Sequence, residues 1–122
     1  MRELLITIIV MCCLVAPVYS ADQSITHVVI VWLNEDVSEQ EISEIIAKTH
    51  VLSDINVVQR LKVGKPVASE RKTVDDSFAL AISVEFKNEN DMQQYIVDQT
   101  HREYVQSVLA PVMKKIVVYD FQ

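Results

Sequence analysis

The chain has 122 residues, of which 50% are hydrophobic and one is glycine, so it is long enough for one domain with a hydrophobic core and lacks the composition of a disordered protein. Its formal net charge is −6, with both signs interspersed along the sequence. Because proteins bind nucleic acids through clustered lysine and arginine side chains, this balance argues against a nucleic-acid partner.

Residues 1–20 have the features of a secretory signal peptide. Arg2 gives a weakly positive start, a continuous apolar stretch follows, and a small-residue cleavage site lies near Ser20 and Ala21. The apolar stretch is shorter than the roughly 20 residues of a membrane span, although Glu3 weakens the positive start and leaves an uncleaved anchor open. We expect a secreted or periplasmic protein without stable membrane association after cleavage. Both cysteines precede the cleavage site, so we expect no disulfide or cysteine metal site in the mature chain.

The stretch Ile25–Leu33, I-T-H-V-V-I-V-W-L, is predicted to be a strand because β-branched and aromatic residues suit a pleated surface. Side chains alternate along a strand, and here both faces are mostly apolar. One face carries a single titratable side chain, His27. Helices of the same domain can cover one face of a sheet, so we expect a partner subunit to cover the other face.

The middle of the chain is predicted to hold a helix, a strand and a long loop. Ser38 and Glu41 have the spacing of a capping box, which predicts the start of a helix, and apolar residues at helical spacing follow as far as Thr49. Residues 55–63 are predicted to be the second strand. Residues 65–76 show no periodicity and many polar side chains, which predicts the longest loop of the chain.

Two further strands are predicted for residues 78–86, where large and small side chains alternate, and for Met113–Phe121. The predicted order of elements is β-α-β-β-α-β. This is an α+β, ferredoxin-like pattern, in which an antiparallel four-stranded sheet has its helices on one face.

The helical region between these two strands is predicted to break. Asn88 or Asn90 is expected to cap its first helix. Thr100 and Glu103 are spaced as a second capping box, which predicts that the helix restarts at His101.

Three histidines, His27, His50 and His101, are too far apart in sequence to form a local metal motif, so no metal site is expected. His27 lies on a strand and His101 begins a helix that packs on the same sheet. If His27 faces the helices, the two rings can converge on one pocket, to which Tyr95 can add a phenolic donor. The alternatives are a core histidine bonded to the backbone and a space-filling tyrosine.

Three short motifs of hydrolases and nucleotide-binding proteins are absent from the sequence. There is no G-x-S-x-G, no P-loop and no G-x-G-x-x-G, which argues against nucleotide-dependent enzymes and hydrolases with a nucleophile elbow. The spacing of the serine, histidine and aspartate residues does not by itself exclude a Ser-His-Asp triad.

Several stretches resemble the Dabb family, the stress-responsive dimeric A/B barrel domain, over residues 24–122. They are I-T-H-V-V-I-V-W-L, F-A-L-A-I-S-V-E-F with the following N-E-N-D-M-Q-Q-Y, D-Q-T-H-R-E-Y-V and K-K-I-V-V-Y-D-F. The most specific marks are His27 and His101. The resemblance implies a homodimer in which the sheets of two protomers pack face to face to form an α/β barrel, and a role in stress response.

Within this family the chain is similar to plant polyketide cyclases of the olivetolic acid type. The similarity implies His101 as the catalytic acid/base, His27 as a supporting histidine and Tyr95 as an orienting phenol. The chain departs from these cyclases in having Thr49, or a neighbour, where they have a further pocket tyrosine, and D-D-S-F where they have G-Y-T/D.

Three functions follow as expectations. The first is a module that binds a small apolar or aromatic molecule between sheet and helices. The second is a cofactor-independent lyase, cyclase or isomerase with His101 as general base, and whether the protein is an enzyme stays open. A weaker third is a cofactor-free monooxygenase or a haem-handling barrel. No cofactor is expected for the first two.

Overall fold

The computed structural model describes residues 23–122, and the predicted signal peptide lies outside them. The elements in chain order are β1 (Ile25–Leu33), α1 (Glu39–Thr49), the 3-10 helix η1 (His50–Asp54), β2 (Arg60–Gly64), β3 (Leu80–Phe86), α2 (Glu89–Val97), α3 (Gln99–Tyr104), the π-helical segment η2 (Val105–Leu109) and β4 (Met113–Phe121). None of the helices within residues 23–122 has the length and apolar character needed to cross a bilayer.

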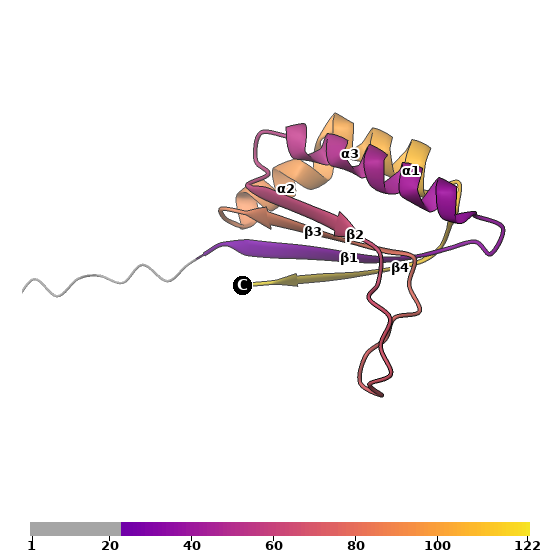
Figure 1. Ribbon diagram of the computed structural model, residues 1–122. Coiled ribbons are helices and arrows are strands. Elements are labelled where there is room, and N and C mark those ends of the chain that lie inside the picture. Colours follow the sequence, from indigo (N-terminus) through magenta and orange to yellow (C-terminus); the bar gives the residue numbers. More distant parts are fainter. Residues whose placement is uncertain (1–22) are drawn as a thin grey trace, which may run out of the picture.

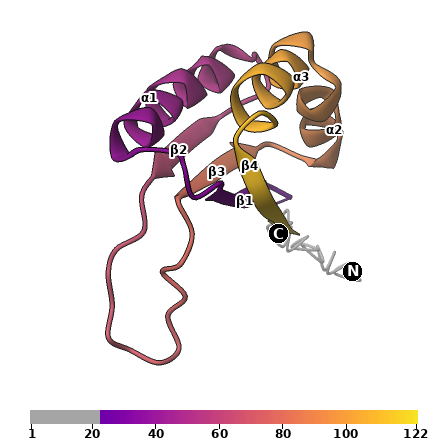
Figure 2. The same ribbon diagram turned by 90° about the vertical axis from the view of Figure 1, so that its right-hand side faces the viewer.

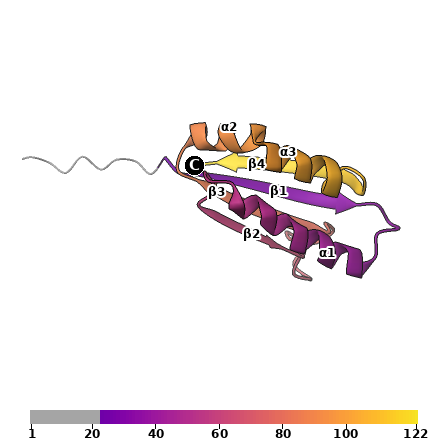
Figure 3. The ribbon, with the colours of Figure 1, turned by 90° about the horizontal axis from the view of Figure 1, so that it is seen from above.

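The strands form one antiparallel sheet in the order β2-β3-β1-β4, and the helices all lie on one face of it (Figure 1). Seen from above, α1 lies over the β2 side of the sheet, and α2 and α3 lie over the β4 side (Figure 3). This two-layer arrangement confirms the predicted α+β, ferredoxin-like fold.

The two faces of the sheet differ in how they are covered. Side chains of β1 alternate between buried and half-buried, and the buried set, which includes His27, faces the helices. The opposite face, here called the outer face, carries the half-buried β1 side chains Val28, Ile30 and Trp32. The antiparallel register of β4 adds Tyr119 and Phe121, which are 59% and 55% exposed. Along β1 and β4 the outer face is therefore largely apolar, and no helix within residues 23–122 covers it.

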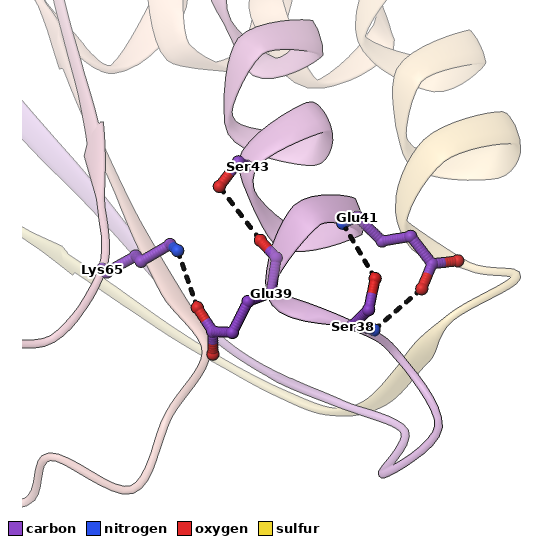
Figure 4. Close-up of polar contacts among 5 residues, drawn as sticks. All are labelled: Ser38, Glu39, Glu41, Ser43 and Lys65. Atoms are coloured by element: carbon purple, nitrogen blue, oxygen red, sulfur yellow. Dashed lines mark hydrogen bonds and ion pairs between the residues drawn. The ribbon is translucent and has the colours of Figure 1, made fainter.

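The N-terminus of α1 has the predicted capping box (Figure 4). The backbone N–H of Glu41 donates to Ser38 Oγ at 3.2 Å, and the backbone N–H of Ser38 donates to Glu41 Oε2 at 2.8 Å. Lys65 at the end of β2 forms an ion pair with Glu39 at 2.8 Å. The cap sets the start of α1, which buries Ile42, Ile45 and Thr49 against the sheet and its neighbouring helices.

The predicted starts of two strands are wrong. The second strand begins at Arg60 and not at residue 55, because Val58 N–H donates to the carbonyl of Ile55 and closes a turn. Ile55 lies in that turn and its side chain is buried, so its apolar character does not indicate a strand. The third strand begins at Leu80 and not at residue 78.

The break in the second helical region is confirmed, but its cap is not the predicted one. Asn88 caps α2, which ends at Val97. The side chain of Asp98 accepts from Thr100 N–H at 2.8 Å, so Asp98 is the N-cap of α3. The helix therefore restarts at Gln99, two residues before the predicted position.

Candidate functional site

A cavity of about 350 Å³ lies between the helix-facing side of the sheet and the segment formed by α3 and η2. This volume is in the range of small-molecule pockets. Most of the lining is apolar, and the polar side chains that reach it are His27, Tyr95, His101, Tyr104 and Asp120. The structure thus brings together the three residues that the sequence predicts for a site.

His27 on β1 is held by Asp120 on β4. The two residues are register partners in the β1–β4 ladder, and His27 Nδ1 lies 2.5 Å from Asp120 Oδ1. An ionised carboxylate can only accept a hydrogen bond, so Nδ1 of His27 carries the proton of this contact, and whenever the ring is neutral Nε2 is its unprotonated nitrogen. The sequence left open that His27 is a core histidine bonded to the backbone, but its Nδ1 is bonded to the Asp120 side chain.

Asp120 is not among the residues that the sequence predicts for the site. It lies 93 residues from His27 in the chain, and only the strand register makes them neighbours. The sequence feature that could have indicated Asp120 is that it is the one carboxylate in the otherwise apolar and basic final strand.

His101 on α3 is oriented by the helix break. Within a continuous helix, the carbonyl of Ile96 would accept from the N–H of Thr100 four residues later. Here Thr100 N–H is bonded to Asp98, and His101 Nδ1 lies 3.0 Å from the Ile96 carbonyl oxygen. A carbonyl oxygen can only accept, so Nδ1 donates and Nε2 of the neutral ring is unprotonated. The break therefore both places His101 and selects its tautomer.

The surroundings of His101 favour its neutral form. Burial lowers its pKa below the usual 6.5, and the nearby His27 lowers it further, while the bond to Ile96 and the charge of Asp98 act in the opposite direction. An uncharged imidazole with a free Nε2 is the form that can act as a general base.

Tyr95 on α2 packs against both histidines. Its ring centroid lies 4.5 Å from that of His101 and 6.0 Å from that of His27, and the side chain is 2% exposed. Burial and the neighbouring Tyr104 raise the pKa of Tyr95, so the phenol keeps its proton and is available as a hydrogen-bond donor.

Tyr104 on α3 forms a fixed wall of the cavity. The hydroxyl of Thr49 donates to the carbonyl of Ile45 at 2.7 Å, which commits its one proton. Tyr104 must therefore donate to Thr49 Oγ1, also at 2.7 Å. Thr49 is fully buried behind Tyr104 and supports this wall from outside the cavity lining.

The cavity opens along the edge strand β4. Ile116 and Val118 line it from the helix-facing side of the sheet and are 40% and 45% exposed. Val105 and Leu109 of the π-helical segment, in which Ala110 N–H donates to the carbonyl of Val105, line the same cavity. The entrance along β4 is therefore apolar.

No group of three histidine, cysteine, aspartate or glutamate side chains in the part of the chain that the structure describes is arranged to hold a metal ion. The arrangement of His27, Tyr95 and His101 instead offers two basic nitrogens and one hydroxyl donor. Such a set can bind a polar group and move a proton.

Comparison with known proteins gives a family and a set of related folds. The family model of the stress responsive A/B barrel domain, Dabb, matches residues 25–122. A hydroxynitrile lyase from Passiflora edulis is 22% identical over 82% of this chain and 93% of its own, with a TM-score of 0.71. No curated protein sequence matches significantly.

Two further solved structures share the fold. A Dabb family protein with a ferredoxin-like fold from Mesorhizobium loti is 19% identical, covers 81% of this chain and 95% of its own, and has a TM-score of 0.68. A dimeric protein of unknown function from Bacteroides fragilis is 19% identical, covers 82% and 96%, and has a TM-score of 0.66. At these identities the similarity shows the fold.

Proposed function

The chain belongs to the Dabb family of stress responsive A/B barrel domains, and we propose that its cavity binds a small apolar or aromatic molecule that carries a polar group. The observation that carries this proposal is an apolar cavity of about 350 Å³ in which His27, Tyr95 and His101 all lie in the lining. Ligand pockets typically combine such a lining with a few convergent polar groups. The ligand's apolar part would contact Val105 and Val118, and its polar group would meet the imidazoles and the phenol.

We also propose a secreted or periplasmic homodimer. The leader-like residues 1–20 support the location. The uncovered apolar side chains of the outer face, Val28, Ile30, Tyr119 and Phe121, support a second copy as the missing layer. The related protein from Bacteroides fragilis is itself described as dimeric.

A second candidate function is cofactor-independent lyase, cyclase or isomerase chemistry. It is favoured by one observation, the ring contact between Tyr95 and a His101 whose Nδ1 is bonded to the Ile96 carbonyl, at a place where burial favours the neutral imidazole and the protonated phenol. In such a reaction Nε2 would take a proton from a carbon next to a carbonyl, while Tyr95 would donate a hydrogen bond to the enolate oxygen. The Passiflora edulis protein shows that this fold supports a lyase.

The binding proposal can be tested with acetophenone, a compact aromatic ketone, by titration calorimetry. Val118→Trp would fill the apolar entrance, and Val51→Trp is a matched control, because Val51 is 42% exposed and lies outside this cavity. We expect saturable binding by the wild type and the control, and loss of binding by Val118→Trp. Equal binding by all three proteins, or no binding by the wild type up to the ketone's solubility limit, would contradict the proposed site.

The catalytic candidate is separated from simple binding by isotope exchange. In D2O, proton abstraction by His101 would replace methyl protons of acetophenone with deuterium, which proton NMR detects. We expect exchange above the buffer rate in the wild type and its loss in His101→Gln. Saturable binding of acetophenone without isotope exchange would support a protein that only binds the ketone, and would contradict a role of His101 as a base towards it.

A further inference from the structure

The segment between β2 and β3, residues 65–79, leaves the body of the domain on the side away from the helices (Figures 1 and 2). We call it the β2–β3 arm. It contains no helix or strand, yet it holds its own shape through local bonds. Ser69 N–H donates to Asp76 Oδ2 at 2.9 Å across the arm, and Val74 N–H donates to the carbonyl of Arg71 at 3.0 Å. The arm is a structured projection of the domain.

The base of the arm is tied to the outer face of the sheet through Trp32. The indole N–H of Trp32 donates to Ser77 Oγ at 3.0 Å, and its ring meets that of Phe78 edge-on at 6.4 Å. Lys115 of β4 covers the same indole, with Nζ 4.6 Å from the ring centroid. These contacts join the arm to the apolar surface that we propose as the dimer interface.

The distal part of the arm exposes apolar surface. Val67 is 84% exposed, the highest value among the exposed large hydrophobic side chains of the described residues, and it follows Pro66 in the sequence. An apolar side chain gains free energy when a partner removes it from water. No part of residues 23–122 of the same chain covers Val67.

We propose that the β2–β3 arm is a dimerisation arm that packs its Pro66–Val67 region against a second copy of this chain. The inference rests on the proposed homodimer. Face-to-face sheets lie about 10 Å apart, whereas 15 residues folded back on themselves can reach about 20 Å or more at 3.3 Å per residue. The arm leaves the domain on the outer side of the sheet (Figure 1), so an arm that reaches further than the spacing between sheets would run alongside the partner. Two-fold symmetry makes the contact reciprocal, so each dimer gains two arm contacts.

Substitution of Val67 tests the arm separately from the sheet interface. Val67→Asp places a charge at the arm contact, and Val97→Asp is its control, because Val97 is 63% exposed on α2 in the helix layer. In sedimentation equilibrium we expect Val67→Asp to weaken the dimer by about tenfold or more, a factor that corresponds to about 1.4 kcal/mol. The control should change the dissociation constant less than threefold, an effect of about 0.6 kcal/mol.

A photo-crosslinking amino acid at position 67 gives a direct second readout. We expect illumination to link two copies covalently from position 67 and not from position 97. If the wild type is a dimer but Val67→Asp matches its control and position 67 yields no covalent dimer, the arm is overturned while the homodimer stands. A wild-type protein that stays monomeric at high micromolar concentration would overturn both.

Discussion

Asp120 Oδ1 lies 2.5 Å from His27 Nδ1, and the two residues are opposite each other in the β1–β4 ladder. The pair joins the first strand of the domain to the last, directly at the cavity. Asp120 therefore orients a histidine that the sequence alone presents as an isolated polar residue on a buried strand.

Replacing Asp120 by Ala should change the protonation pattern of the His27 ring. The carboxylate is the acceptor that keeps the proton on Nδ1, so its loss should increase the Nε2-protonated tautomer. Imidazole nitrogen chemical shifts in NMR measure this ratio. Glu85→Ala, which removes an exposed partner of Arg60, is the control and should leave His27 unchanged. Identical His27 shifts in all three proteins would show that Asp120 does not select the tautomer.

Tyr95→Phe should affect binding more than stability. The ring and its packing on Phe86 and His101 are kept, and only the hydroxyl is lost. Because one hydrogen bond contributes about 0.5–1.5 kcal/mol, we expect acetophenone affinity to fall by about twofold to twelvefold. Titration calorimetry measures the affinity, and urea unfolding should show a change below about 1 kcal/mol. An unchanged affinity would remove Tyr95 from the proposed ligand contacts.

His101 should make the folded protein less stable in mild acid. Its pKa is lowered mainly by burial, so the unfolded chain binds this proton at a higher pH than the folded chain does. The free energy of unfolding should fall as pH drops through the usual histidine value of 6.5 and level off below the folded-state pKa. In urea unfolding at several pH values, His101→Gln should lack this part of the loss. A steeper acid loss in the variant would contradict the assigned direction.

Asp98→Ala should release the helix break that orients His101. Loss of an N-cap costs about 1 kcal/mol, and Asn88→Ala is a matched control, because it removes the cap of α2 in the same way. Only Asp98→Ala frees Thr100 N–H to compete for the Ile96 carbonyl. Both variants should lose similar unfolding free energy, but only Asp98→Ala should shift the imidazole nitrogen signals of His101. Equal effects on His101 would reject this account of the break.

The sequence predicts the sheet well because its strands carry a clear pattern. The β-branched and aromatic residues of Ile25–Leu33 and Met113–Phe121 predict both strands at the observed residues. The start of the second strand is predicted too early because Ile55 is apolar and buried, as a strand residue would be, although it lies in a turn. The α3 cap is misassigned because Asp98 and Thr100 both suit an N-cap.

The candidate site is only partly readable from sequence. His27, Tyr95 and His101 lie on elements whose order predicts that they share one side of the sheet, and they do meet in the cavity. Asp120 depends on the register between two strands at opposite ends of the chain, which no local pattern encodes. The orienting carbonyl of Ile96 is a backbone group, and its availability follows from the cap at Asp98. The monooxygenase or haem alternative stays a prediction.

The central claim is that His27 and His101 belong to one ligand site, and the histidine ring signals of the protein test it most directly. His50, which is exposed at the end of α1, is an internal control in the same spectrum. When acetophenone is titrated into the wild type, the ring signals of His27 and His101 should shift together with one dissociation constant, while those of His50 stay in place. Unmoved signals for His27 and His101, or two different dissociation constants, would contradict a single shared site.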